Sequence, residues 1–321
     1  MKRRSLLVAA LAAPSIVPGV ALGQEAWPKK TVKFICPFAA GGGTDTVSRL
    51  MCDQLSKALG QTFVVENKGG AGGNIGTVEL ARAAPDGYTI GLISVASHTL
   101  NPMLYSRLPY NPDKDIVAVS RVALLANLLG VTPSLPANNV AELIALCKKE
   151  PGKYSFASGS SAAIVSGATF ASLAGLELLH VPYKSSPPAL TDLIAGRVSM
   201  MFIDVPTGLP HVNAKALKAL AVTTKQRSAL LPELPTMDAT VKGFDITSWQ
   251  GYLGPANLPK DIVTRLNAEI RKVVERPDIK RQLADRGMEA FSGSPEQFAA
   301  FLKEQLVVWE KLIKGAGIEK Q

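Results

Sequence analysis

Short apolar runs alternate with longer amphipathic segments through most of the chain. Residues 31–36 have the pattern of a buried strand, residues 45–59 that of a helix, and residues 62–66 that of a β-branched strand. A helix over residues 75–84 and a strand over residues 88–94 follow. Alternation of this kind is typical of mostly parallel sheets with helices packed on both faces. The sequence therefore predicts an α/β fold.

A second series of elements begins after an apolar run over residues 117–131. The elements expected in it are helices over residues 140–149, 162–173 and 188–195 and strands over residues 154–158, 178–182, 198–203 and 218–223. Residues 244–253 are then expected to return the chain to the first series of elements. The chain from residue 260 onward is expected to be helical. Two crossings make a hinge and leave a cleft between two lobes. We expect lobe 1 to span residues 24–125 and 246–321, and lobe 2 to span residues 126–245.

The first residues have the organisation of an export signal. Lys2, Arg3 and Arg4 form a positively charged start, residues 6–20 are apolar, and small residues lead to Gly23. We expect residues 1–23 to be an export signal peptide that is removed after Gly23, which places the mature protein in the periplasm. The arginine pair is similar to a twin-arginine signal, and the general export route stays open. A membrane anchor is the competing interpretation, which the short apolar length and its two prolines disfavour.

The charge and the cysteines exclude several classes of site. The formal charge of +9 includes three basic residues of the export signal, and no basic run is interleaved with aromatics, so no nucleic-acid partner is expected. Cys36, Cys52 and Cys147 lie among apolar neighbours and are expected to be buried structural thiols, while a disulfide between two of them stays open. No CxxC or CxxH spacing occurs. We therefore expect no zinc site, no other metal and no cofactor.

A glycine-rich turn follows the first strand, in the sequence FICPFAAGGGTDTVSRL. Open α/β sheets bind ligands at the carboxyl ends of their strands, where helix amino ends present unpaired N–H groups that favour an anion. A second such turn, residues 69–73, is expected to lie beside the first if their strands are neighbours. A well-capped structural turn, with Thr44 or Asp45 as the cap, explains the first turn about as well. The strict GxGxxG spacing fails and no GxxxxGKS or GxxxxGKT occurs, so phosphate binding is a minor alternative.

A third turn, Ser158-Gly159-Ser160, opens a βα unit of the second series. The sequence from Gly159 to Ala163 lacks the final glycine of a GxSxG nucleophile elbow. The three histidines of the chain have no acid at a telling spacing, so a hydrolase that uses Ser160 is an alternative without further support. We expect the serines to donate hydrogen bonds to a bound oxygen instead.

Several longer motifs, taken in order, carry a family resemblance. They are CPFAAGGGTDTVSRL, VVENKGGAGGNIGTVELARAAPDGYTI, NPMLYSRLPYNPDKDIVAV, HVPYKSSPPALTDLIAGRVSMMF and LKALAVTTKQRSALLPELPTM. In register over essentially the mature chain, they resemble the Bug (TctC-like) family of periplasmic solute-binding receptors. The resemblance implies two α/β lobes in the manner of type II periplasmic binding proteins, with carboxylated solutes bound between the lobes. It also implies that the chain is a receptor of the kind that serves tripartite tricarboxylate transporters.

The resemblance further implies which residues hold the ligand. Backbone amides of the two glycine turns would hold one carboxylate, and the serine turn would close over the other side of the ligand. The ligand-binding residues expected are Phe38, Ala39, Ala40, Gly41, Gly43, Thr44, Gly70, Ala71, Gly72, Ser158, Gly159, Ser160, Tyr183, Ile203 and Asp204. Asp45 is expected to cap the helix whose amino end receives the anion.

The sequence departs from the usual family motifs where ligand specificity is expected to reside. The departures are Ile164 and Val165 in place of His-Leu, Ser185 in place of glycine, and Ile203 between Phe202 and Asp204. Since apolar residues replace polar ones, we expect the far end of the ligand to be less charged than an amino acid, as in an aliphatic or aromatic carboxylate.

Together these features predict a monomeric, exported receptor that closes on a small organic carboxylate and presents it to membrane permease subunits. No covalent chemistry is required, so the chain is not expected to be an enzyme. The alternatives are a sensor that binds the same class of ligand for a signalling partner, a serine hydrolase that uses Ser160, and a transferase that acts on phosphate-bearing ligands.

Overall fold

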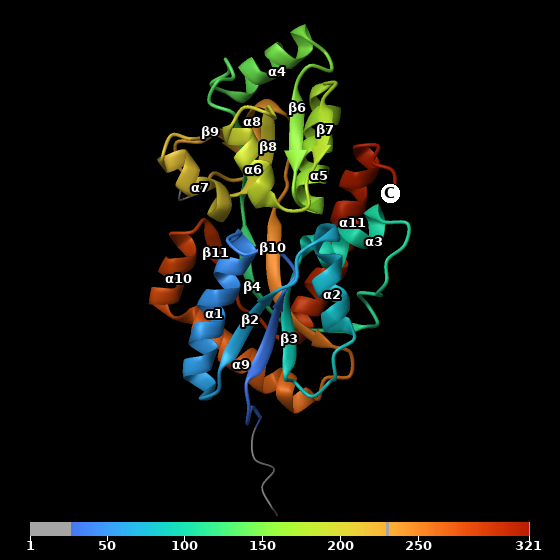
Figure 1. Ribbon diagram of the computed structural model, residues 1–321, viewed down its shortest axis with the longest axis vertical. Helices are drawn as coiled ribbons and strands as arrows, with labels where there is room; N and C mark the ends of the chain where they lie inside the picture. The colour runs from blue at the N-terminus through green and yellow to red at the C-terminus, as the bar shows by residue number, and fades with distance from the viewer. Residues whose placement is uncertain (1–26, 229–230, 321) are drawn as a thin grey trace, which may run out of the picture.

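The computed structural model describes residues 27–228 and 231–320. Two β-sheets lie one above the other along the long axis of the molecule, and helices cover each of them (Figure 1). The six-stranded sheet has the order β11-β4-β10-β3-β1-β2, and the five-stranded sheet has the order β7-β6-β8-β5-β9. The predicted export signal and its cleavage site lie outside the described residues.

The six-stranded sheet forms the lower lobe in Figure 1. Its strands are β1 (Val32–Cys36), β2 (Phe63–Asn67), β3 (Thr89–Ser94), β4 (Ile116–Leu125), β10 (Ser248–Pro255) and β11 (Met288–Ala290). Strand β1 is parallel to β2 and β3, whereas β10 is antiparallel to β3 and β4, and β11 is antiparallel to β4. One face packs against α1 (Gly43–Leu59), α9 (Lys260–Glu275) and α10 (Pro277–Ala284), and the other against α2 (Asn74–Ala81) and α11 (Pro295–Gly315).

Burial in this lobe follows the helical periodicity of the sequence. In α1, Val47, Met51 and Leu55 recur every four residues and are fully buried. In α9, Leu266 and Ile270 repeat the pattern. Residues four apart lie on one helix face, so each helix presents an apolar stripe to the sheet. Burying one such side chain contributes roughly 1.5–3 kcal/mol to stability.

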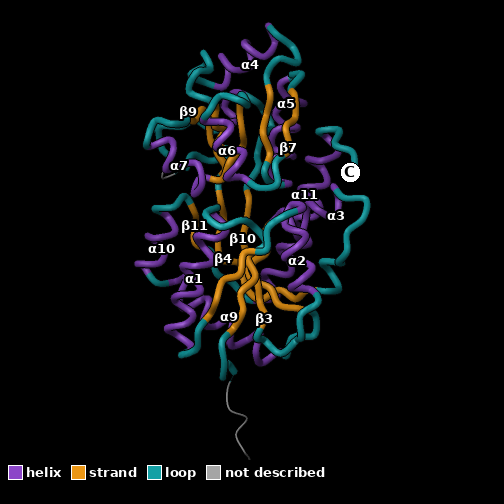
Figure 2. Tube along the Cα trace, in the orientation of Figure 1, coloured by secondary structure: helices purple, strands orange, loops and turns teal. Residues whose placement is uncertain are grey.

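The five-stranded sheet forms the upper lobe, where Figure 2 shows strands flanked by helices. Its strands are β5 (Asn127–Val131), β6 (Ser155–Ser158), β7 (Leu179–Pro182), β8 (Met200–Asp204) and β9 (Lys218–Val222). Strand β6 is parallel to β7 and β8, and β5 is antiparallel to β8 and β9. The helices are α4 (Val140–Lys149), α5 (Ser161–Ala174), α6 (Ser186–Ile194), α7 (Val205–Asn213) and α8 (Met237–Thr240).

The expectation of mostly parallel sheets is wrong, because both sheets are mixed. Strand β4 leaves the lower lobe and continues through Ala126 into β5, and β10 carries the chain back (Figure 1). A strand that leaves a lobe and one that returns to it run in opposite directions, so they pair antiparallel. Where the two crossings meet, Asn127 Nδ2 donates a 3.1 Å hydrogen bond to Ser248 Oγ. We keep residues 24–125 with 246–321, and residues 126–245, as the proposed limits of lobes 1 and 2.

Several elements have no counterpart among the expectations from sequence. They are the 3-10 turn η1 (Ala71–Gly73), the π-helical turn η2 (Ala96–Leu100), α3 (Asn101–Leu104), α7, α8 and β11. In α7, Pro206 lies in the first turn and Pro210 lies inside the helix. Proline inside a helix removes a hydrogen bond and normally signals a break, which conceals this helix in the sequence. None of the helices in the described part of the chain has the length and apolarity needed to cross a membrane.

Candidate functional site

A small cavity lies between the two lobes, where β1, β3, β6 and β8 end and the chain crosses from lobe to lobe. Its volume is about 80 Å³, well below the roughly 300–1,000 Å³ of most small-molecule pockets. The two lobes therefore lie close together at this point. The lining residues are Phe38, Ala39, Gly42, Gly43, Thr44, Ser94, Val95, Ala96, Leu125, Asn127, Ser160, Ala162, Ala163, Ser185, Ser186, Pro187, Phe202, Asp204, Ser248, Trp249 and Gln250.

Helix amino ends converge on this cavity from both lobes. The N-cap residues of α1, α5, α6 and α7 are Gly42, Ser160, Ser185 and Asp204, and all four line it. The π-helical turn η2 adds Ala96 at its first position. Each helix amino end presents unpaired N–H groups and a partial positive charge. The arrangement suits an anionic ligand.

Among the described residues that line the cavity, Asp204 carries the only charged side chain. An anion there has neutral donors rather than a Lys or Arg side chain as partners. Two N–H groups of the first glycine turn are already engaged, because Gly41 donates to Asp45 Oδ2 and Gly43 donates to Thr207 Oγ1, both at 3.0 Å. The N–H of Thr44, at the amino end of α1, has no partner in the described part of the chain and can serve a ligand.

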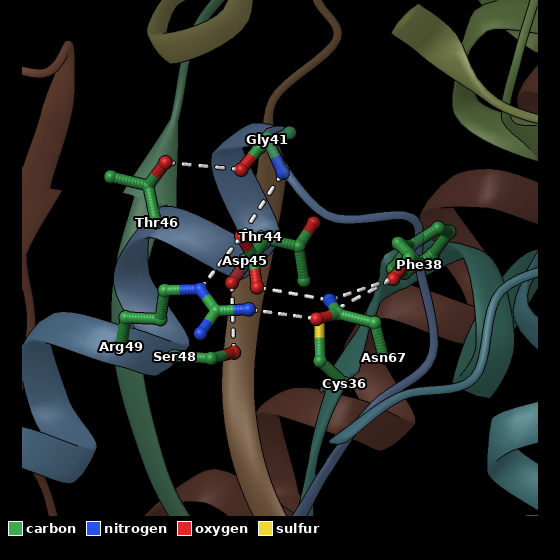
Figure 3. Close-up of polar contacts among 10 residues, drawn as sticks. Cys36, Phe38, Gly41, Thr44, Asp45, Thr46, Ser48, Arg49 and Asn67 are labelled. Atoms are coloured by element: carbon green, nitrogen blue, oxygen red, sulfur yellow. Dashed lines mark hydrogen bonds and ion pairs between the residues drawn. The ribbon is translucent and has the colours of Figure 1, made fainter. Parts of the chain in front are cut away.

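Asp45 holds the first glycine turn together (Figure 3). Its carboxylate accepts hydrogen bonds from the Gly41 N–H at 3.0 Å, from Arg49 Nε at 3.0 Å and from Asn67 Nδ2 at 2.9 Å. Burial raises the pKa of Asp45, but these hydrogen bonds outweigh burial and hold the pKa below its ordinary value. The N-cap of α1 is Gly42, and Asp45 is the third residue of the helix. Asp45 therefore fixes the turn from inside the helix rather than from the cap position at which it was expected.

The second glycine turn lies beside the first, as expected, because β1 and β2 are neighbours. A glycine makes this contact close, since a Cβ on Gly69 would lie 3.0 Å from the Ala39 nitrogen. Gly70, Ala71 and Gly72 do not belong to the cavity lining. The second turn therefore packs against the first. Of the two glycine turns, only the first contributes residues to the cavity lining.

Hydrogen bonds join the lobes on both sides of the cavity. On one side the Gly43 N–H donates to Thr207 Oγ1 at 3.0 Å, and Thr207 Oγ1 donates to Asp204 Oδ1 at 2.7 Å. On the other side Ser161 Oγ of α5 donates to Asn101 Oδ1 of α3 at 2.6 Å. A Cβ on Gly43 would collide with Asp204 Oδ1, so only glycine fits between the closed lobes at this point.

The Asp204 carboxyl is the acidic group at this interface. Burial raises its pKa, and the hydrogen bonds from the side chain and the N–H of Thr207 lower it by less. The carboxyl is therefore easier to protonate than an ordinary aspartate.

In the serine turn, Ser160 and Ser158 have different hydrogen-bond partners. Ser160 Oγ accepts a 3.3 Å hydrogen bond from the Ala163 N–H and so caps α5. The histidine contact is made by Ser158, whose Oγ lies 2.6 Å from His180 Nε2. Neither Ser158 nor His180 belongs to the cavity lining. The structure thus separates the serine that reaches the cavity from the serine that contacts a histidine.

The structure divides the residues expected to bind ligand into two groups. Those in the cavity lining are Phe38, Ala39, Gly43, Thr44, Ser160 and Asp204. Those outside it are Ala40, Gly41, Gly70, Ala71, Gly72, Ser158, Gly159, Tyr183 and Ile203. Ile164 and Val165, from which an apolar ligand end was inferred, also lie outside the lining.

Local contacts explain why several of the expected residues lie outside the cavity lining. Ile203 is 1% exposed, because side chains alternate along β8 and its neighbour Phe202 faces the cavity. Tyr183 Oη donates a 2.7 Å hydrogen bond to Asp192 on α6. Gly159 serves close packing, since a Cβ there would collide with the backbone that leads into α6.

Several lining residues were not expected from the sequence. They include Ser94 at the end of β3 with Val95 and Ala96 after it, Leu125, Asn127, Ser248, Trp249 and Gln250 on the crossing strands, and Gly42, Ala162, Ala163, Ser186 and Pro187 at helix amino ends. The rule that ligands bind at the carboxyl ends of parallel strands points to Ser94 as well as to the glycine turns. The crossing strands were expected to border the cleft, but the sequence carries no signal for which of their residues face it.

Within residues 27–228 and 231–320, no cluster of His, Cys, Asp and Glu side chains could hold a metal ion. Cys36, Cys52 and Cys147 are buried free thiols, as expected, so no two of them form a disulfide. Burial raises the pKa of all three thiols, to about 11 for Cys147. The thiols therefore stay protonated at neutral pH and act as small apolar side chains.

Comparisons with known proteins agree with this architecture. Residues 47–318 match the model of the tripartite tricarboxylate transporter family receptor, TctC. The structure of R. palustris Rpa4515 with adipate is 34% identical with a TM-score of 0.91, over 92% of this chain and 100% of that one. The structure of the periplasmic binding protein BugD is 35% identical with a TM-score of 0.87, over 92% and 100% of the two chains. MatC from Rhodopseudomonas palustris with bound malate is 29% identical with a TM-score of 0.84, over 89% and 100%.

The family match begins within α1 and runs almost to the end of α11, and the likeness to each of the three structures covers the whole of the other chain. The motif resemblance seen in the sequence is confirmed, and so is the two-lobe α/β fold. The chain belongs to the family of tripartite tricarboxylate transporter receptors, which are solute-binding proteins.

Proposed function

We propose that the protein is a periplasmic receptor that captures a small carboxylate between its lobes for uptake. The observation that carries the proposal is the convergence of four helix amino ends on a cavity whose described lining has no basic side chain. Backbone N–H groups at helix ends stabilise a carboxylate without an ion pair. Two similar structures contain adipate and malate, which are both dicarboxylates and support this ligand class.

The cavity lining also indicates the chemistry of the part of the ligand that lies away from the bound carboxylate. Val95, Leu125, Phe202 and Trp249 give the cavity an apolar wall, which suits an aliphatic segment. Asp204 also belongs to the lining and repels a negative charge placed directly against it, so a second carboxylate of the ligand would have to lie away from this residue. We therefore retain the expectation that the far end of the ligand is less charged than an amino acid. The support for it now comes from these residues rather than from Ile164 and Val165.

Closure of the lobes is part of the proposed mechanism. A ligand that touches α1 in one lobe and α5 in the other makes contacts that exist only in the closed form. Such contacts shift the equilibrium between open and closed lobes toward the closed form. The interlobe hydrogen bonds of Gly43 and Ser161 would add to the same shift.

Capture without catalysis is the role that this site supports best. Ser160 is engaged as a helix cap, and the described histidine closest to the serine turn contacts Ser158 instead. We propose that the receptor works as a monomer and hands its ligand to membrane permease subunits, after export and removal of the signal near Gly23. The family to which the chain belongs is named for such a transporter, which favours transport over a sensor.

Native mass spectrometry of the protein, purified from its own periplasm without refolding, tests this function. Binding proteins with closed lobes release ligand slowly, so we expect a retained species with the mass of a small carboxylic acid. Denaturation should release it for identification. Retention of a phosphorylated or uncharged compound instead would contradict the carboxylate assignment.

A further inference from the structure

Outside the interlobe cavity, Arg121 on β4 is a buried arginine. It is 9% exposed, and its Nε is fully buried with no hydrogen-bond acceptor within residues 27–228 and 231–320. No carboxylate of the described residues lies within 4.0 Å of its guanidinium. Burial lowers the pKa of Arg121 to about 10, so the side chain remains charged at neutral pH. A buried charge without a counterion is costly, and a native fold that keeps one calls for an explanation.

Two aromatic rings hold this guanidinium in place. Its Cζ lies 3.2 Å from the ring centroid of Phe291 and 3.9 Å from that of Phe301. The two rings stabilise the cation through its faces. They cannot accept the N–H groups, which point outward in the guanidinium plane. The side chain is thus fixed while its two Nη groups, which are not buried, remain available for a bidentate carboxylate contact.

The backbone around Arg121 is shaped for this arrangement. In the pairing of β4 with β10, Gln250 is opposite Ala123 and Gly251 is opposite Arg121, which leaves Val122 as a bulge. The Phe291 N–H donates a 2.9 Å hydrogen bond to the Val122 carbonyl and so brings its ring to the arginine. Bulges of this kind re-aim a neighbouring side chain and recur beside functional sites.

A cavity opens beside the guanidinium. Its volume is about 230 Å³, and its lining residues are Arg121, Phe291, Ser292, Gly293, Gln297 and Phe298. The amino end of α11, a helix of 21 residues, borders it and adds a partial positive charge. Glu289 and Glu304 attract the arginine electrostatically from a distance without forming an ion pair. Since the pocket combines a fixed cation, a helix amino end and free volume, we propose that it is a second anion site, in which Arg121 receives the carboxylate of a small organic acid.

The indole of Trp249 lies near this pocket. Trp249 packs edge-on against Phe298 and Phe301, with ring centroids 5.7 Å and 5.8 Å apart. The same Trp249 lines the interlobe cavity. The aromatic side chains beside Arg121 therefore contact a residue that also lines the interlobe cavity.

The experiment is a titration of the wild-type protein with sodium acetate, followed by amide NMR at constant pH and ionic strength. We expect saturable shifts of the Ser292 and Gly293 amides and of the Arg121 Nε–H. Sodium chloride at the same ionic strength should not reproduce them, because chloride cannot bond two N–H groups in one plane. The amides of Ala39 and Thr44 report the interlobe cavity separately, so binding at the two sites is resolved.

Matched variants complete the test. Arg121→Met keeps the apolar packing between the rings and should abolish the saturable shifts of Ser292 and Gly293. Arg121→Lys keeps the charge but loses the planar fork, and should weaken acetate binding several-fold. Absence of saturable shifts in the wild type, an equal response to chloride, or unchanged shifts in Arg121→Met would each overturn the proposal. The wild-type titration decides the matter even if a variant folds poorly.

Discussion

The backbone N–H of Gly43 donates a 3.0 Å hydrogen bond to Oγ1 of Thr207 in the opposite lobe. This bond joins the amino end of α1 to that of α7 beside the cavity. Thr207 in turn donates to Asp204, whose side chain lines the cavity. Closure of the lobes is thus tied to the same glycine turn that is proposed to hold the ligand. The first predictions concern these three residues.

Gly43→Ala is expected to weaken ligand binding while leaving each lobe folded. Its new Cβ would collide with Asp204 Oδ1 only when the lobes are closed. Overpacking costs roughly 1–3 kcal/mol, which corresponds to about 5- to 150-fold in Kd. Calorimetric titration and thermal melting of the apo protein measure the two effects separately.

Gly315→Ala is the control for the added methyl group. Gly315 lies at the end of α11, outside the cavity lining, and apart from the adjoining chain no atom lies within 4 Å of an added Cβ. The control should bind within a few-fold of the wild type. Equal loss of affinity in both variants would show that the Gly43 contact has no special part in closure.

Thr207→Val should reduce affinity by about fivefold. The substitution keeps the side-chain shape but removes the hydroxyl that bonds Gly43 and Asp204. One lost hydrogen bond costs about 1 kcal/mol, and the ligand must supply that free energy when it closes the lobes. Thr207→Ser, which keeps the hydroxyl, should restore most of the affinity. An unchanged Kd for Thr207→Val would contradict the role given to this bond.

Asp204→Asn should change how stability and binding depend on pH. Because burial raises the pKa of Asp204 above its ordinary value of 3.8, the folded protein keeps this proton at a pH where the unfolded chain has lost it. The protonated carboxyl therefore contributes to the free energy of unfolding at low pH, and this contribution is lost as the pH rises through the raised pKa. The asparagine variant should therefore melt at a higher temperature than the wild type at neutral pH, and this advantage should vanish in acid.

The affinity for a carboxylate ligand should also depend on the protonation of Asp204. A carboxylate ligand should bind the wild type more tightly as the pH falls toward the raised pKa, since a neutral Asp204 no longer repels it. Asp204→Asn should bind several-fold tighter at neutral pH and show a flatter profile. Titrations across the range from about pH 4 to about pH 8 check this. Weaker binding by the asparagine variant would instead indicate that the ligand donates a hydrogen bond to an ionised Asp204.

Ser160→Ala separates the receptor from a serine hydrolase. The substitution removes the cap of α5, which costs about 1 kcal/mol, and should lower the melting temperature and weaken binding. Ser160→Asn, which can cap the helix, should recover stability. Assays with small esters should detect no turnover in any of these proteins. Ester hydrolysis by the wild type that Ser160→Ala abolishes would support the enzyme instead.

Regular elements with strong apolar periodicity could be predicted from the sequence. The helix expected over residues 140–149 coincides with α4, Val140–Lys149, because its pattern is uninterrupted and Asn139 caps it. The α7 helix could not be predicted, since Pro210 inside it opposes the helical pattern locally and the packing of the lobe overrides this. The mixed sheets also escaped prediction, because strand direction depends on where the chain crosses between lobes.

The site could be predicted in outline but not residue by residue. The first glycine turn was correctly placed at the end of β1 and beside the second turn, since both follow from strand order. Whether a residue faces the cavity depends on strand phase and on tertiary contacts. Phe202 faces it, and the next residue, Ile203, is buried on the other side of β8. Asn127 and Ser248 line the cavity only because two distant crossings meet there.

Calorimetric titration of the wild-type protein with adipate and with its neutral diamide tests whether the cleft binds a carboxylate. The two compounds share a carbon chain and differ in the charge at their ends. If helix amino ends hold a carboxylate between the lobes, adipate should bind with a stoichiometry of one in the cleft, Gly43→Ala should weaken it, and the diamide should bind far more weakly. Equal binding of the diamide, or adipate affinity that is indifferent to Gly43→Ala, would contradict the account.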